Sequence, residues 1–432
     1  MSNIKIKNAI IVLLLTVLGV FYFYRLHYDG YADVFADEIV CNTPVYNNSF
    51  DIIPDYKLPA DFPRYSVYGK SIIDGDFYVS MYNPGLPKES YIFIMSSSGD
   101  IKWYKKIRGY AYNFRKIKYN DGTIRYAYQQ VDRFISEEFG LMGTHVVLMD
   151  EHFNVINNFI HPLKYGSITS ENHGCENHEY KILSDHHYIL TTVSKNIVTN
   201  IPGYEGEKIK VFNSIIQEQK DGKVIMQWES IDYPELYTAS LCNNNYKNYK
   251  MKFMDFIIDK STIKHTDYFH INAIAIDKNS GDLLISGRGV GLVKIDRDNG
   301  NIFWIMGRKK NNTKELDEKD LGLYQHDVKY LDDGSITIFD NSGGYGENSR
   351  VCRYWIDENN KTLIKKEIFD IPYKGKYMGS AELLDDDTDT YLICNGGPFE
   401  GNAFEERSFK NNNVGFALNF DNGNNLYRIF QG

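Results

Sequence analysis

Residues 269–307 read FHINAIAIDKNSGDLLISGRGVGLVKIDRDNGNIFWIMG and contain four apolar segments separated by short polar connections. The two tight turns, KNSGD and RDNGN, are rich in Asn, Asp and Gly, which favour hairpins between antiparallel strands. The stretch therefore predicts a strand, a turn, a strand, a crossing connection, a strand, a second turn and a last strand. That pattern describes one four-stranded antiparallel sheet.

This unit recurs six times along the chain. The first kind of turn and the strand after it appear in IIDGDFYVSMY, YNDGTIRYAY, SDHHYILTTV, KNSGDLLISG, DDGSITIFD and DDTDTYLIC. A second turn follows each, and the first apolar residues after it are Ile101, Val155, Val224, Ile302, Leu363 and Leu426. Six sheets that cover one another's faces around an axis predict an all-β, six-bladed β-propeller. A β-sandwich would not require the same two turns six times.

Composition agrees with a chain made mostly of strands. Aromatic residues make up 15% of the 432 residues, with 34 Tyr and 25 Phe against 4 Trp, and such residues favour pleated, half-buried surfaces. The net charge is −9, and no dense Lys/Arg cluster is present, which argues against a nucleic-acid partner. We expect the propeller to span residues 65–432, after a linker over 36–64, with an insertion at one mouth over 237–260. A homodimer is left open.

The first 35 residues differ from the rest of the chain. Lys5 and Lys7 precede an uncharged run over residues 9–24, and positive charge before an apolar run predicts a cytoplasmic amino terminus and an exported body. We expect residues 1–35 to form a signal or membrane-anchor helix. Because the small-residue cleavage site at 34–36 is weak, an uncleaved anchor is favoured. The expected location is the periplasmic or extracellular face of the cytoplasmic membrane.

The cysteines do not form a recognisable metal motif. They contain no C-x-x-C pair and no zinc-ribbon spacing, so a metal site built on sulfur is not expected. An exported protein can pair its cysteines, but an odd number leaves at least one unpaired in the monomer, and the connectivity stays open. The five are Cys41, Cys175, Cys242, Cys352 and Cys394.

Three histidines share one position in consecutive units. His178 and His326 each lie 8 residues before the middle of the first turn, and His270 lies 11 before it because its turn is longer. In the second unit the same position holds Phe114, so the fold does not require histidine there. Equivalent positions on neighbouring blades are related by rotation about the axis. We therefore expect the three imidazoles to converge at one end of the central funnel.

Other polar residues are expected at the same mouth. Arg288 follows the return strand of the His270 hairpin, and antiparallel pairing brings it back to the end where that histidine lies. By the same reasoning Asn341 returns beside His326, and Arg350 belongs to a Gly-rich mouth loop. Imidazoles with a guanidinium suit a tetrahedral oxyanion such as sulfate or phosphate, because arginine meets two oxygens at once.

Histidine chemistry allows two further uses of this ring. An imidazole can act as a nucleophile and split a transfer reaction into two displacements. Three histidines are also a common zinc or copper ligand set. Because the guanidinium of Arg288 would repel a dication, we predict neither a metal nor a cofactor.

The residues around these histidines resemble the bacterial arylsulfate sulfotransferase family. The resemblance is carried by residues 269–307, by YQHDVKYLDDGSITIFDNSGGYGENSRVCRYWID at 324–357 and by MGSAELLDDD at 378–387. It implies a propeller outside the cytoplasm that moves the sulfuryl group of a phenolic sulfate ester to a phenolic acceptor. The nucleotide donor of cytosolic sulfotransferases would not be used. The histidine of the Q-H-D element, His326, would be the nucleophile that becomes sulfated.

The resemblance also implies roles for the neighbours of His326. His270, in the H-x-N element, and Arg288, in the S-x-R element, would hold the sulfuryl oxygens, while His178 matches a further histidine of the family. The expected substrate-binding residues are Asn272, Asn341 and Arg350. Glycines follow the arginine in SGRGVG where bulkier residues are expected, which points to a different acceptor. Two other functions stay open: a non-catalytic propeller that binds an anionic glycan or partner, and a His-ligated metalloenzyme.

Overall fold

The computed structural model describes residues 58–82, 89–136, 140–169, 174–241, 264–342, 348–375, 377–396, 402–421 and 425–432. The predicted signal or anchor segment lies outside these ranges, as do residues 242–260 of the predicted mouth insertion. No helix within the described ranges is long and apolar enough to cross a lipid bilayer. The described residues include three short helices: η2 (Ser230–Asp232), α2 (Pro234–Ala239) and η4 (Glu318–Asp320).

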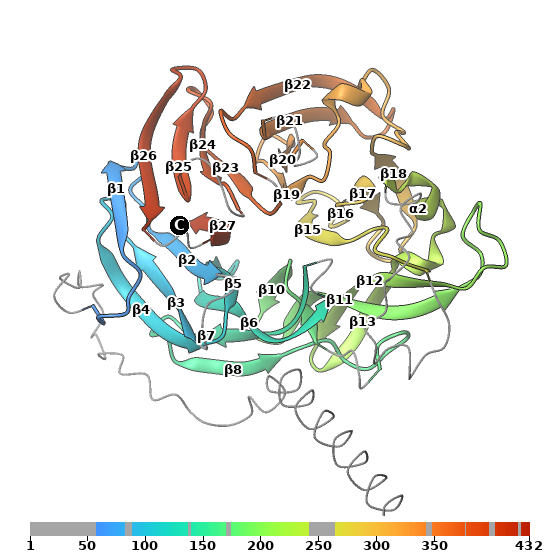
Figure 1. Cartoon of the computed structure of the whole chain (residues 1–432), viewed down its shortest axis with the longest axis horizontal. Coiled ribbons are helices and arrows are strands. Elements are labelled where there is room, and N and C mark those ends of the chain that lie inside the picture. Colours follow the sequence, from blue (N-terminus) through green and yellow to red (C-terminus); the bar gives the residue numbers. More distant parts are fainter. Residues whose placement is uncertain are drawn as a thin grey trace, which may run out of the picture.

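Six mainly antiparallel sheets stand around a central axis, each forming one blade (Figure 1). This arrangement confirms the predicted all-β, six-bladed propeller. From the inner strand outward, blade one is β27 (Asn425–Gln431), β2 (Phe77–Tyr82), β3 (Glu89–Met95) and β4 (Ile101–Arg108). Blade two is β5 (Ala111–Lys118), β6 (Ile124–Ser136), β7 (Leu141–Met149) and β8 (Val155–Ile160), with β9 (Cys175–Glu176) pairing to β7. Blade three is β10 (Tyr180–Ser184), β11 (His187–Val198), β12 (Ile209–Lys220) and β13 (Lys223–Glu229), with β14 (Lys264–Thr266) pairing to β12.

The remaining blades follow the same inner-to-outer order. Blade four is β15 (Ile271–Ile276), β16 (Leu283–Gly287), β17 (Gly291–Ile295) and β18 (Ile302–Met306). Blade five is β19 (His326–Tyr330), β20 (Ile336–Asp340), β21 (Arg350–Asp357) and β22 (Thr362–Asp370). Blade six is β23 (Ser380–Asp385), β24 (Thr390–Cys394), β25 (Phe404–Ser408) and β26 (Asn413–Phe420), with β1 (Tyr65–Gly69) on its outer edge.

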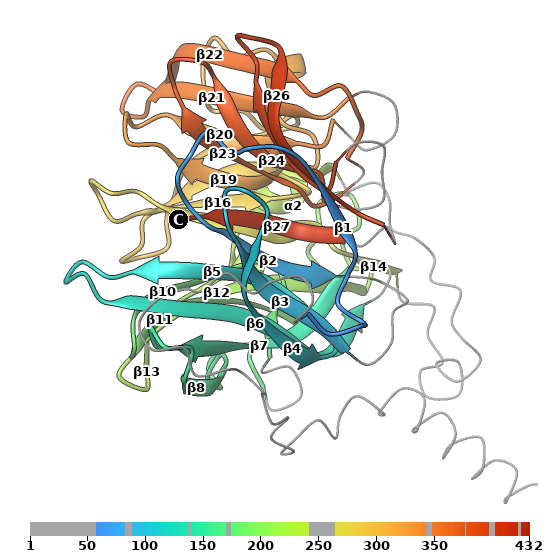
Figure 2. The same ribbon diagram turned by 90° about the vertical axis from the view of Figure 1, so that its left-hand side faces the viewer.

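The ring is closed by strands from opposite ends of the described chain. Both views place β27 beside β2 (Figures 1 and 2), and Phe77 lies opposite Gln431 in that pair. At the other junction β1 pairs with β26, with Tyr65 opposite Phe420. The sequence assigned the strand at Leu426 to the sixth unit, and that assignment was wrong. Pairing each terminal strand with a blade from the other end of the chain ties the first and last blades together.

The apolar core is divided among the interfaces between neighbouring blades. One cluster joins blades three and four and another joins blades four and five. Three tryptophans that lie just after a second turn are buried between blades and are at most 4% exposed: Trp103 between blades one and two, Trp228 between three and four, and Trp304 between four and five. Burying apolar area stabilises the folded state by about 25 cal/mol per Å². The packed blades therefore form a rigid frame for side chains near the axis.

Candidate active site

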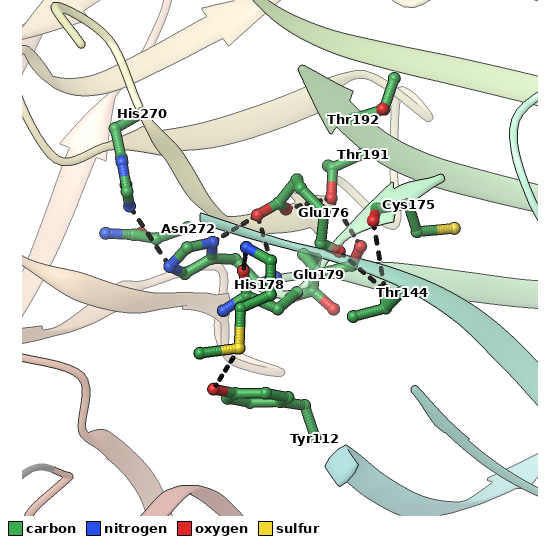
Figure 3. A network of polar contacts seen from close by, with 12 residues as sticks. Tyr112, Thr144, Cys175, Glu176, His178, Glu179, Thr191, Thr192, His270 and Asn272 are labelled. Atoms are coloured by element: carbon green, nitrogen blue, oxygen red, sulfur yellow. Dashed lines mark hydrogen bonds and ion pairs between the residues drawn. The ribbon is translucent and has the colours of Figure 1, made fainter. Parts of the chain in front are cut away.

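Three buried histidines lie at the starts of the inner strands of three consecutive blades. His178 precedes β10, His270 precedes β15 and His326 is the first residue of β19, and each is at most 4% exposed. The Nε2 atoms of His178 and His270 are 3.2 Å apart, and their rings meet edge-on with centroids 4.6 Å apart (Figure 3). Burial is the main cause that lowers the pKa of His326 well below its usual value, and the neighbouring His178 and His270 add to the effect. Asn272, two residues after His270, donates to the carbonyl of Gln325, the residue before His326, at 2.6 Å. The structure therefore brings together the strand starts that carry the three imidazoles.

His270 reaches this position through an unusual backbone conformation. Its φ of 57° lies in the left-handed region, which costs a residue with a Cβ about 1–2 kcal/mol. The register of β15 against β16 shifts immediately afterwards, between Ile271 and Ala273. Bulges of this kind re-aim side chains and are frequent beside active sites. Surrounding contacts must therefore hold the His270 side chain in place.

A carboxylate and a guanidinium provide those contacts. His270 Nδ1 is hydrogen-bonded to Asp267 Oδ2, and Arg288 Nη2 donates to the same oxygen at 3.2 Å. The backbone N–H of Arg288 donates to the His270 carbonyl at 2.9 Å, so the hairpin does return the arginine to the histidine. Burial and the nearby Arg288 charge lower the pKa of His270 to about 4. Burial alone would raise the pKa of Asp267, but the charges of His270 and Arg288 bring it below its usual value.

His178 is held in a similar way by a second carboxylate. Its Nδ1 is hydrogen-bonded to Glu176 Oε2, and its backbone N–H donates to the same oxygen at 3.1 Å. The other oxygen of Glu176 accepts a hydrogen bond from the Thr191 hydroxyl (Figure 3). The ring of Tyr427, from the closing strand β27, meets the His178 ring edge-on with centroids 5.5 Å apart. These contacts fix both the plane and the tilt of the imidazole.

His326 is held by an amide instead of a carboxylate. Its Nδ1 lies 2.7 Å from Asn341 Oδ1 and 3.1 Å from the Tyr324 carbonyl oxygen. Asn341 Nδ2 donates to the carbonyls of Gly375 and Met378 at 2.9 and 3.0 Å, which assigns the orientation of the amide. Because both neighbours of Nδ1 are acceptors, Nδ1 carries the proton and Nε2 carries the lone pair. Within the described chain, Nε2 has no hydrogen-bond partner.

Two of the predicted substrate-binding residues lie beside the histidines. Asn341 positions His326, and both polar groups of its side chain are used in contacts within the protein. Asn272 is fully buried, and its Nδ2 donates to the Gln325 carbonyl at 2.6 Å. Its Oδ1 has no hydrogen-bond partner among the described residues. Asn272 thereby links the starts of β15 and β19.

The third predicted substrate-binding residue, Arg350, is engaged elsewhere. Its Nε donates to Asp340 Oδ2 at 3.0 Å and its Nη1 to the Lys319 carbonyl at 3.1 Å. Arg350 is the first residue of β21 and lies directly opposite Asp340 in the β20 pairing. This in-register carboxylate was not predicted as its partner. No hydrogen bond or ion pair of the described residues joins Arg350 to the histidines.

Several residues of this centre were missed by the sequence argument. Asp267 and Glu176 lie three and two residues before their histidines, and a carboxylate so close to a candidate histidine was a usable signal. Tyr427 and Arg428 come from β27. Their position depends on how the ring closes, for which the local sequence holds no signal.

Arg428 links all three histidine-bearing segments. It is 1% exposed, and its Nη1 donates to Glu179 Oε2, next to His178, at 2.8 Å. Its Nη2 donates to the carbonyl of Asn272, two residues after His270. Its Nε forms an ion pair with Asp327 Oδ1, next to His326, at 3.4 Å, and this Nε has no hydrogen-bond partner among the described residues. One guanidinium from the closing strand therefore ties blades three, four and five together.

The glycines after Arg288 have a structural explanation. A Cβ added at Gly289 would lie 2.2 Å from the Tyr268 carbonyl oxygen, and the Gly289 N–H donates to the Phe269 carbonyl at 3.1 Å. We expect Gly289→Ala to lower the melting temperature by several degrees, because overpacking costs about 1–3 kcal/mol, and to displace Arg288. Thermal unfolding measures the effect. Gly75→Ala, whose Cβ would meet its nearest atom at an ordinary 3.5 Å, is the control, and an equal shift in both variants would contradict the explanation.

Three of the five cysteines lie in the described ranges. Cys175, Cys352 and Cys394 are buried free thiols, and burial raises the pKa of each. In the same ranges, no three His, Cys, Asp or Glu side chains are grouped so that they could hold a metal ion. The polar groups gathered at the histidines are imidazoles, carboxylates, an amide and a guanidinium.

Comparison with known proteins places the chain in a family. A curated arylsulfate sulfotransferase, AssT from Lelliottia amnigena, is 28% identical over a segment that covers 22% of this chain and 22% of that protein. Solved structures of a protein of unknown function from Bacteroides caccae and of another from Dyadobacter fermentans are 12% identical, with TM-scores of 0.41 and 0.40. They match 83% and 82% of this chain and 99% and 86% of their own chains. The arylsulfotransferase (ASST) family model matches residues 71–428. The chain therefore belongs to the arylsulfotransferase (ASST) family.

Proposed function

We propose that the protein transfers the sulfuryl group of a phenolic sulfate ester to a second phenol through a sulfated His326, without a nucleotide donor. The observation that carries this proposal is the state of His326. Its Nδ1 is tied to Asn341 and the Tyr324 carbonyl, its pKa is held low by burial, and its Nε2 lone pair has no partner in the described chain. A neutral, oriented imidazole with a free lone pair is a competent nucleophile.

The first half-reaction breaks the ester bond. His326 Nε2 attacks sulfur in line, the N–S bond forms, and the S–O bond to the phenol breaks. The guanidinium of Arg288, which shares the Asp267 carboxylate with His270, opposes the negative charge on the sulfuryl oxygens. A neighbouring histidine, acting as a general acid, gives a proton to the departing phenolate oxygen.

The second half-reaction regenerates the enzyme. The acceptor phenol attacks the sulfur of sulfated His326 and gives its proton to the histidine that acted as acid. The N–S bond breaks, and its electron pair returns to Nε2. Because the two phenols use the same site in turn, the kinetics should be ping-pong.

The proposal is tested by incubating the full chain with 4-nitrophenyl sulfate, with and without phenol. We expect acceptor-dependent release of 4-nitrophenolate and, before the acceptor is added, a single sulfuryl adduct on the intact protein. Adding a nucleotide sulfate donor should change neither result. Saturable binding of the ester without release or adduct would contradict the proposal and favour the non-catalytic propeller, and loss of activity on chelation would favour the metalloenzyme.

We further propose that the protein acts on the outer side of the cytoplasmic membrane and is held there by residues 1–35. The support is the pair of lysines before the uncharged run at residues 9–24, which favours export of the body. Protease added to intact spheroplasts should degrade the propeller. Protection of the propeller until the membrane is opened would refute this location.

A further inference from the structure

Four buried groups form one hydrogen-bonded chain across the candidate site. Glu176 is bonded to Nδ1 of His178, the two Nε2 atoms of His178 and His270 face each other at 3.2 Å, and Nδ1 of His270 is bonded to Asp267. All four side chains are at most 5% exposed. Two carboxylates therefore lie at the ends of the chain and two imidazoles at its centre.

The number of protons shared by these four side chains follows from the hydrogen bonds between them. An imidazole nitrogen that faces a carboxylate must donate, or the carboxyl group must itself carry the proton. The contact between the two Nε2 atoms needs one further proton, because two lone pairs at this distance would repel. Three protons are thus shared among four nitrogen atoms and two carboxyl groups. Two neutral imidazoles would supply only two.

The extra proton is placed by the charges that surround the pair. Arg288 lies on the His270 side, where it shares Asp267 Oδ2, and its positive charge and burial lower the pKa of His270 to about 4. On the His178 side, Glu176 accepts from His178 and Thr191. Because Asp267 is shared with the Arg288 guanidinium and Glu176 is bonded to no cation among the described residues, the geometry places the extra proton on the His178 side, where Nε2 of His178 donates to Nε2 of His270.

The other ionisable groups that face the pair do not supply this proton. Burial raises the pKa of Tyr427 and keeps its phenol neutral, and burial keeps His326 neutral by lowering its pKa. Glu179, which follows His178, is paired with Arg428 at 2.8 Å. Among the described residues, Glu176 and Asp267 are the carboxyl groups hydrogen-bonded to the two imidazoles.

We infer that Glu176 and Asp267 are positioning residues that keep one transferable proton on the His178–His270 pair, and that this proton goes to the departing phenolate. The inference rests on the proposed function. In the first half-reaction the phenolate oxygen takes the proton from His178 Nε2 as the S–O bond breaks. In the second, the acceptor phenol returns a proton to the same nitrogen as its oxygen attacks sulfur. Each complete cycle leaves the number of protons on the pair unchanged.

The test compares two sulfate donors whose leaving phenolates differ in how strongly they need to be protonated. Phenolate is a strong base, since phenols of this kind have a pKa of about 10, whereas 4-nitrophenolate leaves readily as an anion. We expect Glu176→Gln to lower kcat/KM for phenyl sulfate by a factor on the order of 100, because general acids contribute about 10²–10⁴-fold. With 4-nitrophenyl sulfate the loss should stay below about threefold. Equal losses with both donors would overturn the inference.

The matched control is Glu218→Gln. Glu218 is also buried and also bonded to a histidine, His187, at 2.5 Å, but in blade three next to Arg297. The kcat/KM of this variant should equal that of the wild type with both phenyl sulfate and 4-nitrophenyl sulfate. If it shows the same selective loss with phenyl sulfate, the loss does not come from the His178–His270 pair and the inference is wrong.

A measurement on the wild type keeps the test decisive if a variant fails to fold. The rate with phenyl sulfate should fall at alkaline pH as the pair loses its proton, and the rate with 4-nitrophenyl sulfate should not. In Asp267→Asn or Glu176→Gln this alkaline limb should move to lower pH, because removing a carboxylate destabilises the charged imidazole. Identical wild-type profiles for the two donors would overturn the inference while leaving the proposed function intact. Absence of release and adduct with both donors would instead overturn the proposed function.

Discussion

Replacing His326 with asparagine is expected to lower turnover of 4-nitrophenyl sulfate by a factor of about 10⁴ or more, as removal of a covalent nucleophile does in other transfer enzymes. An asparagine side chain can still reach the Asn341 amide, but it has no lone pair of comparable basicity at the position of Nε2. The sulfuryl adduct on the intact protein should vanish together with the turnover. Nitrophenolate release and intact mass, measured on the same sample, check both results.

The control for this substitution is His145→Asn. His145 is hydrogen-bonded to Asp132 at 2.8 Å on blade two, and no hydrogen bond or ring contact among the described residues joins its side chain to His178, His270 or His326, so its replacement should leave turnover and adduct as in the wild type. His326→Asn should also retain a cooperative thermal transition, because a side chain of similar polarity replaces a histidine that is neutral in the folded state. A His326→Asn protein with wild-type turnover would remove the nucleophile from the proposal.

The pH dependence of this step follows from the same environment. Burial is the main cause of the lowered pKa of His326, and the charges of His178, His270 and Arg288 add to it. Because the pKa lies well below the usual value, the imidazole stays unprotonated as pH falls through 6.5. Loss of activity on acidification should therefore begin only at more acidic pH than for an exposed histidine.

The repeated sheet and the meeting of the histidines could be predicted because their signals are local. Each hairpin is marked by its own turn residues, and the position of His178 or His326 relative to its turn can be counted along the chain. Symmetry then converts equal positions in the sequence into neighbouring positions in space. The place of Arg288 followed in the same way, since an antiparallel hairpin returns to its starting end.

The parts that could not be predicted depend on contacts between distant strands. The strand at Leu426 has the same local pattern as the other outer strands, and only closure of the ring makes it the inner strand of blade one. Arg350 was expected to bind substrate, and the sequence did not predict that its cross-strand partner Asp340 holds it. Asn341 was expected to bind substrate, yet its amide is used in positioning His326. In each case a partner in space, absent from the local sequence, decides the role.

Arg428 is the clearest case of a role set by closure, and its replacement is expected to have the largest effect on stability. Arg428→Met would remove the buried cation that Glu179 and Asp327 share, and would leave Glu179 with Arg115 and Lys181 and Asp327 with Lys329 nearer the surface. Removing one partner of a buried ion pair typically costs 3–5 kcal/mol, so we expect the free energy of unfolding to fall by about that amount. Denaturant unfolding of the full chain measures this loss. A loss below about 1 kcal/mol would contradict the role of Arg428 as a link between blades.

The same variant should also lose activity in the molecules that remain folded. Because Arg428 contacts the residues next to His178 and His326 and the carbonyl of Asn272, its loss frees the three segments to move independently, and misplacement by about 1 Å can cost on the order of 100-fold in rate. The control is Arg407→Met, which breaks the pair with buried Glu405 at 2.6 Å in blade six and should lower stability with little change in turnover per folded molecule. Arg428→Lys keeps the charge but lacks the planar fork that reaches several partners at once. It should therefore recover part of the stability while turnover stays low, and full recovery of turnover in Arg428→Lys would show that charge alone, without simultaneous contacts to three blades, is sufficient.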